Sequence, residues 1–165
     1  MFDDFGLGRV MDGEATLPIM AWRLDNEKKC NANESLVVVK KIHIERNSFK
    51  QIISSVGMDE DRVKERILKI VNDRGKLHNP FTNTGGTIYG IVSEIGKEFN
   101  AQLDVNEPII ISTSATMVPL HLDIIKSIDF VFGSMEVEGY CILFNGYYCV
   151  KKPKTGITRN IIIGF

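Results

Sequence analysis

One short loop gathers side chains that could do chemistry. In the stretch RGKLHNPFTNTGGTIYGIV, residues 74–92, His78 can donate, accept or take up a proton near neutral pH. Gly85 and Gly86 allow a ligand to approach the backbone closely, and further hydrogen-bonding groups come from Asn79, Thr82, Asn83 and Thr84. A polar connection from a helix to a strand explains the same residues, because Asn-Pro and Gly-Gly are turn chemistry. The residues alone leave both interpretations open.

No metal or phosphate motif is complete elsewhere. The three histidines, His43, His78 and His121, are far apart, and none has a His or Cys partner at helical or hairpin spacing. The glycine-containing stretches FGLGRV and NTGGTIYG do not lie between a strand and a helix, as a phosphate-binding loop requires. We therefore expect no metal site and no phosphate loop.

Composition excludes several classes of protein. The chain has 165 residues, of which 44% are hydrophobic and 25% charged, and this suits one folded domain. A net charge of −1 gives no broad attraction to nucleic acid. No apolar run reaches the roughly 18 residues of a membrane span, and the acidic N-terminus lacks a secretory signal. Three scattered cysteines favour reduced thiols, so we expect a cytoplasmic protein.

Helical spacing predicts two helices before the loop. NSFKQIISSV places apolar residues on one face, with Asn47 or Ser48 as the N-cap and Gly57 as the stop. The clearer pattern is DEDRVKERILKIVNDR, whose acidic start suits the helix dipole and which ends at Gly75. The first thirty residues show little periodicity and suggest an extended arm.

Strand patterns account for most of the remainder. Residues 34–44, 87–96 and 106–115 are rich in β-branched residues, and Gly90 inside the second run indicates a bend, a bulge or a close backbone approach. GYCILFNGYYCVKKP is predicted to be a hairpin with its turn at Asn145-Gly146. PLHLDIIKSIDFV is compatible with a short helix or an extended segment. The sequence thus predicts a β-rich α+β domain with one long helix and one or two short ones.

The order of these segments resembles the GroES-like catalytic domain of the medium-chain dehydrogenase/reductase superfamily. ESLVVVKKIHIERNSFKQI is similar to its first long strand and the following turn, and GGTIYGIVSEIGKEF to its glycine-rich strand. GYCILFNGYYCVKKP is similar to the later strand pair that ends in a Lys-x-Pro phrase. The resemblance implies a GroES-like, partly open β-barrel over residues 1–152, with 153–165 as a tail of unknown role.

A narrower resemblance is to the L-erythro-3,5-diaminohexanoate dehydrogenase family of anaerobic lysine fermentation. It rests on FGLGRV, LPIMAWRLDN, ILKIVNDRGKLHNPFTNTGGTIYGIVSEIG and VEGYCILFNGYYCV, and covers residues 5–152. The resemblance implies an NAD-dependent oxidative deamination of a small diamino acid. It further implies His78 as the base, and a substrate site drawn from Glu45, Ser48, Asn79, Thr82, Gly85 and Gly86.

Two departures from the superfamily shape these expectations. Where many members carry zinc ligands this sequence has IERNS, Gly86 and Thr87, and the four-cysteine zinc loop is missing, so we expect no zinc. The residues after 152 match no Rossmann motif. We therefore expect NAD binding only with a Rossmann domain supplied elsewhere, and no activity of the chain alone.

Three functions remain open at the level of sequence. The chain is the substrate-binding half of a dehydrogenase that works with a Rossmann-domain partner, a non-catalytic GroES-like interaction module that forms a homo-oligomer or binds another protein, or an inert remnant.

Overall fold

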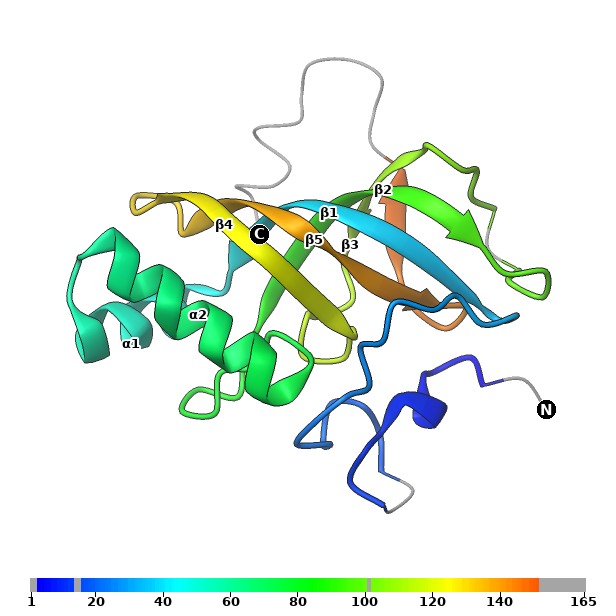
Figure 1. Cartoon of the computed structure of the whole chain (residues 1–165), viewed down its shortest axis with the longest axis horizontal. Helices are drawn as coiled ribbons and strands as arrows, with labels where there is room; N and C mark the ends of the chain where they lie inside the picture. Colours follow the sequence, from blue (N-terminus) through cyan, green and yellow to red (C-terminus); the bar gives the residue numbers. More distant parts are fainter. Residues whose placement is uncertain (1–2, 14–15, 101, 152–165) are drawn as a thin grey trace.

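A computed structural model describes residues 3–13, 16–100 and 102–151, which form one antiparallel sheet with two helices beside it (Figure 1). The six strands lie in the order β4-β5-β1-β2-β3-β6. Their bounds are β1 Glu34–Ile44, β2 Gly86–Ile95, β3 Pro108–Ile111, β4 Leu120–Asp129, β5 Ser134–Phe144 and β6 Cys149–Lys151. The helices are α1 Arg46–Val56 and α2 Glu60–Arg74, with a short 3-10 helix at Leu7–Arg9. The expected β-rich α+β class is confirmed.

The sheet is open. Its edge strands are β4 and β6, and within the described residues these two strands do not pair with each other. The partly open GroES-like barrel is therefore not confirmed. The expected tail, residues 153–165, lies outside the described residues.

β1 is the long central strand, and its inward side chains form much of the core. Val37, Val39, Ile42 and Ile44 are almost completely buried. The register with β2 shifts between Val39 and Lys41, opposite Gly90. A Cβ on Gly90 would lie 2.5 Å from the Val38 carbonyl oxygen, so the close backbone approach expected at this glycine is present.

Both helices form where their spacing predicts, but the cap of α1 differs from the expectation. Glu45, rather than Asn47 or Ser48, is the N-cap, and its carboxylate accepts hydrogen bonds from the Asn47 and Ser48 amides. A carboxylate at this position also suits the positive end of the helix dipole. Gly57 follows the last turn of α1, as expected.

α2 packs along β4 and against α1. Its buried stripe is Val63, Ile67, Ile70 and Val71, the face that helical spacing predicts. Asp59 caps its start, and Gly75 ends it in the left-handed conformation at φ 62°. α2 therefore delivers the loop that begins at Lys76 to a fixed place beside the sheet.

The predicted hairpin around Asn145-Gly146 is wrong. The chain does turn there, but β6 pairs with β3, through Ile109–Lys151, Ile110–Val150 and Ile111–Cys149, and not with β5. The turn thus carries the chain from one side of β1 to the far edge of the sheet. The segment left open between helix and strand is strand β4, so its extended interpretation is confirmed.

The N-terminal arm, which we define as residues 3–33 apart from 14–15, is fixed by buried polar bonds. Arg9 is 3% exposed and pairs with Glu34 at 2.8 Å, at the start of β1. Further along, the Leu24 amide donates to the Arg74 carbonyl at the end of α2. The arm therefore crosses beneath the sheet to the last turn of α2 and the loop that follows (Figure 1).

The three cysteines are free thiols, as expected, and Cys141 is completely buried in the core. Neither helix within the described residues has the length and apolarity needed to cross a bilayer.

Candidate functional site

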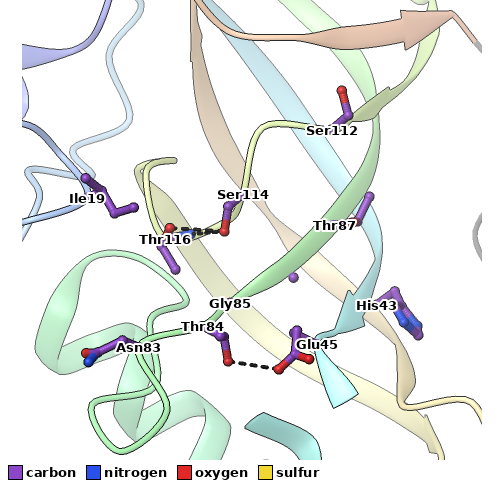
Figure 2. Close-up of a pocket in the computed structure, with 11 residues that line it drawn as sticks. Ile19, His43, Glu45, Asn83, Thr84, Gly85, Thr87, Ser112, Ser114 and Thr116 are labelled. Carbon is purple, nitrogen blue, oxygen red and sulfur yellow. Dashed lines mark hydrogen bonds between the residues drawn. The ribbon is translucent and has the colours of Figure 1, made fainter. Parts of the chain in front are cut away.

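A polar cleft of about 300 Å³ opens where β1 ends and β2 begins (Figure 2). Three stretches far apart in the sequence meet there: the end of β1, the loop before β2, and the connection after β3. The arm adds one side chain, Ile19, which faces the Ser114–Thr116 connection in Figure 2. The lining residues are Ile19, His43, Glu45, Asn83, Thr84, Gly85, Gly86, Thr87, Ser112, Ser114 and Thr116.

The two glycines are needed because the three stretches pack backbone to backbone. Gly86 pairs with Ile44, and a Cβ on it would collide with the His43 carbonyl oxygen. A Cβ on Gly85 would collide with the Leu77 carbonyl and lie 2.9 Å from the Thr116 amide nitrogen. Both glycines line the cleft, and their missing side chains bring its walls together.

Glu45 is the acidic group of the cleft. One of its oxygens, Oε2, accepts hydrogen bonds from the Asn47 amide at 2.9 Å, the Ser48 amide at 3.1 Å and the Thr84 hydroxyl at 3.0 Å. Within the part of the chain that the structure describes, Oε1 accepts none. The carboxylate is thus held in one orientation and keeps an oxygen for a ligand.

Asn79, Ser48 and Thr82 lie one layer away from the cleft, in the network that holds the loop. The buried Asn79 amide donates to the Ser48 hydroxyl at 3.0 Å and to Gln51 at 2.9 Å. Thr82 shares a 2.8 Å hydrogen bond with Thr84, which in turn donates to Glu45. These three candidate residues connect the loop to α1, and they do not line the cleft.

His78 is buried, with 5% of its surface exposed, and does not line the cleft. Burial lowers its pKa to about 4, and the positive charges of Arg74 and Lys76 add to the shift, while the nearby Asn83 side chain opposes it. Among the described residues, neither ring nitrogen has a hydrogen-bond partner of good geometry. The imidazole is therefore neutral at pH 7 and in the state that accepts a proton.

His43, near the end of β1, lines the cleft. Its pKa is lowered by burial and by the charge of Lys41, while Glu45 opposes the shift. Its Nδ1 is buried without a hydrogen-bond partner.

Sequence reasoning missed the wall of hydroxyl groups opposite Glu45. Ser112, Ser114 and Thr116 follow β3, and Thr87 stands at the start of β2. The Thr116 hydroxyl donates to Ser114 at 3.0 Å. The only signal was the run STSAT directly after an apolar strand, a pattern that also occurs in ordinary turns.

In the residues that the structure describes, no group of three or more His, Cys, Asp or Glu side chains is placed to hold a metal ion. A dinucleotide pyrophosphate is usually held by a glycine-rich turn between a strand and a helix. The strand-to-helix junction here, from β1 to α1, consists of Glu45 alone, so it does not fit that group.

The fold and the cleft define a β-rich α+β domain with a small polar pocket and one fixed carboxylate. The profile of the L-erythro-3,5-diaminohexanoate dehydrogenase N-terminal domain family matches residues 8–153. The chain belongs to this family.

Two curated relatives carry the same name. L-erythro-3,5-diaminohexanoate dehydrogenase of Acetoanaerobium sticklandii is 32% identical over 151 residues, which are 90% of this chain and 44% of the relative. The enzyme of Fusobacterium nucleatum subsp. nucleatum is 35% identical over 149 residues, 88% of this chain and 43% of that protein. The chain thus spans less than half the length of these relatives.

Two solved structures align with most of the chain but only weakly. CurK enoyl reductase is 17% identical with a TM-score of 0.38, covering 81% of this chain and 31% of that one. CurF ER cyclopropanase from the curacin A biosynthetic pathway is 14% identical with a TM-score of 0.39, covering 79% and 30%. TM-scores this low do not establish a shared fold.

Proposed function

We propose that this chain is the substrate-binding portion of an NAD-dependent L-erythro-3,5-diaminohexanoate dehydrogenase, an enzyme of oxidative deamination in lysine fermentation. Family membership supports the proposal, since both curated relatives have this name. In this proposal the open sheet is the family's form of the GroES-like, partly open barrel, the site works without zinc, and the protein is cytoplasmic.

The observation that carries the proposal is the fixed carboxylate of Glu45 in a small cleft. A diamino acid brings two ammonium groups, and a partly buried ammonium needs a carboxylate or several oxygen acceptors. Glu45 offers Oε1 for one amine. The Ser112 hydroxyl donates to the Tyr148 carbonyl and offers its oxygen as an acceptor for the second amine, while the hydroxyls of Ser114 and Thr87 offer donors for the substrate carboxylate. A cleft of about 300 Å³ is at the lower end of the size of small-molecule sites.

Loss of hydride from an amine carbon requires a neutral amine, so a protein base must take the ammonium proton. We propose that a neutral histidine takes this proton. His78 is the candidate from the resemblance, because it lies in the stretch RGKLHNPFTNTGG that resembles the family. His43 is the alternative that the geometry favours, because it lines the cleft whereas His78 lies behind it. Separate His78→Asn and His43→Asn variants decide between them: the base is the histidine whose loss removes the lower pKa from the kcat/KM profile.

NAD is held elsewhere in this proposal, because the described residues lack the glycine-rich turn for its pyrophosphate. When bound, the nicotinamide supplies the hydride acceptor. This chain supplies the binding, orientation and deprotonation of the amine, and is inactive until a Rossmann domain meets the cleft.

The test is reconstitution. The purified chain is mixed with the C-terminal part of the Fusobacterium nucleatum relative, and NADH formation from 3,5-diaminohexanoate is followed by absorbance. We expect none from either part alone and NADH formation from the mixture. A mixture that associates, with both parts folded, and still produces no NADH would contradict the proposal.

The second candidate is a non-catalytic interaction module, either a homo-oligomer or a partner for another protein. It is favoured by the apolar side chains that the arm exposes, since exposed apolar clusters usually bind something. Leu17, Met20 and Trp22 are each at least 50% exposed. Self-association of the chain without effect of NAD or the diamino acid would favour this function.

A further inference from the structure

Lys76, which the proposed reaction does not use, is completely buried. Its exposed fraction is 0%, and it directly follows the glycine that ends α2. Its Nζ donates to the Pro18 carbonyl at 2.6 Å and to the Ile19 carbonyl at 3.3 Å. Lysine is rarely buried so completely unless its charge is paired, so this side chain calls for a physical explanation.

The segment that accepts these bonds, Leu17–Trp22, lies against the cleft and is attached to the protein mainly through its backbone. Arg74 donates to the Trp22 carbonyl at 2.9 Å, and its guanidinium lies 4.3 Å from the centre of the Trp22 ring. Most side chains of the segment point outward, with Leu17 50%, Ile19 40% and Met20 74% exposed. Arg74 and Lys76 thus hold a segment that buries little apolar surface of its own.

No acidic side chain among the described residues lies close enough to neutralise a positive charge on Lys76. Among the described residues it makes no ion pair within 4.0 Å. On α2, Arg74 repels it; on the arm, the Asp12 carboxylate attracts it from further away; and in its own loop, His78 is neutral near pH 7. Carbonyl dipoles from the arm are therefore its closest partners.

We propose that Lys76 is a positioning residue whose bonds to the arm hold the Ile19 wall of the cleft, and that release of this segment takes up a proton at Lys76. Ile19 lines the cleft next to the Ser114–Thr116 connection (Figure 2), so release of Leu17–Trp22 removes one wall. This role of Lys76 does not depend on which ligand the cleft binds.

The proton uptake follows from burial. Burial and the charge of Arg74 lower the pKa of Lys76 from its ordinary value of 10.5 to about 7, with Asp12 opposing the shift. When the segment is released, water solvates the amine and its pKa returns towards the ordinary value. The released state therefore binds more protons between these two values, so release becomes easier as pH falls from 10 to 7 and changes little below 7.

Amide hydrogen exchange of Ala21 measures this release in the chain as it is. The Ala21 amide donates to the Leu17 carbonyl within a single turn, and an isolated turn does not protect an amide in water. After correction for intrinsic exchange, we expect the opening constant to rise about tenfold for each unit by which the pH is lowered from 9.5 to 7.5. This is the slope expected for uptake of one proton. Trp22, the single tryptophan of the chain, gives a second readout by fluorescence.

Two methionine variants complete the test. Lys76→Met should show an opening constant that does not vary with pH and that exceeds the wild-type value at pH 9.5, because the two arm carbonyls lose their donor. Lys69→Met, the same change at a lysine that is 64% exposed on α2, should behave as wild type. A flat wild-type profile, or a slope that survives in Lys76→Met, would overturn the proposal. The wild-type profile decides alone if Lys76→Met does not fold.

Discussion

At the scale of single residues, Glu45 uses its two carboxylate oxygens differently. Oε2 accepts hydrogen bonds from two amides at the start of α1 and from the Thr84 hydroxyl, and Oε1 has no partner among the described residues. Glu45→Gln keeps an acceptor oxygen for the helix but removes the charge. In the reconstituted enzyme we expect kcat/KM to fall about 100-fold, since a charged hydrogen bond contributes about 1.5–3 kcal/mol.

The matched control for this change is Glu138→Gln, at a carboxylate that is 55% exposed and pairs with Lys126 on the surface of the sheet. It should leave kcat/KM unchanged, because surface pairs contribute little. If Glu45→Gln retained wild-type kcat/KM with an intact circular dichroism spectrum, Glu45 would not contact the substrate.

His78 makes a prediction about stability. Burial holds its folded pKa at about 4, below its ordinary value of 6.5, so the unfolded chain binds the proton more tightly between these values. Stability should therefore fall as pH drops through this window, by about 2 kcal/mol from pH 7 to pH 5 for this group. Urea unfolding at the two pH values measures it, and His78→Gln should lose less stability over the interval by that amount.

His121 serves as the comparison for His78. Its side chain is 37% exposed and lies by Asp123 on β4. His121→Gln makes the same change of side chain at this partly exposed histidine and is unfolded at the same two pH values. An equal loss in wild type and His78→Gln would mean that His78 is not the group that stays neutral in the folded state.

At the scale of elements, Gly75 joins α2 to the arm and to the loop of the cleft. Its φ of 62° already disfavours a side chain, and a Cβ there would also collide with the Leu24 carbonyl. Gly57, after α1, has a φ of 84° but open space around it. Gly57→Ala should destabilise by backbone strain alone, about 1–3 kcal/mol. Gly75 is in the milder left-handed helical conformation, at ψ 16° against 178° for Gly57, but Gly75→Ala should still destabilise by more, because the collision with the Leu24 backbone outweighs this difference in strain.

Thermal or urea unfolding of the two glycine variants gives this comparison directly. The result that contradicts it is an equal loss of stability in both, which would mean that the arm moves away from Gly75 without cost.

The elements that sequence predicted correctly are those whose signals are local. The buried stripe of α2 follows helical spacing, and the β-branched run of β1 matches the strand to the residue. β4 was ambiguous because its buried residues, Leu120, Leu122 and Ile125, do not alternate regularly. Register shifts between Leu122 and Ile124 and between Ile125 and Ser127 explain this, since each bulge changes the spacing.

The hairpin failed for a different reason. Asn145-Gly146 specifies a reversal of the chain, which is a local property, but the partner of a strand depends on which sheet edge is open. β5 already pairs with β1 on one side and with β4 on the other, so neither of its edges is open. β6 therefore pairs with β3. Long-range pairing of this kind has no signature in a single sequence.

The candidate site shows the same limit. The loop 74–92 was recognisable from its residue types, and Glu45, Gly85 and Gly86 do line the cleft. A polar residue that supports the loop from behind looks the same in sequence as one that lines the cleft. Ser48 and Asn79 were therefore predicted to belong to the site, although they bond to each other behind the cleft. The hydroxyls of Ser112 and Ser114 come from a distant segment, and only the fold brings them in.

At the scale of the whole molecule, the cleft lies beside an apolar surface. The chain spans less than half of its curated relatives. The function proposed above requires a second part, which holds NAD, to meet it. In that proposal the nicotinamide has to reach the cleft. The segment Leu17–Trp22 contributes Ile19 to the rim of the cleft and exposes apolar side chains. This segment is thus where the second part is expected to bury apolar surface.

Leu17→Ser combined with Met20→Ser tests that expectation. The two side chains are 50% and 74% exposed, so the free chain should keep its stability, as surface substitutions usually do. The affinity for the C-terminal part of the Fusobacterium nucleatum relative, measured by calorimetry, should fall by at least about tenfold, since burial of two such side chains contributes about 1.5–3 kcal/mol each. Met58→Ser, at a methionine that is 69% exposed between α1 and α2, should leave the affinity unchanged. Equal affinities in all three proteins would place the contact on another face of the sheet, and the exposed arm would then need a different partner.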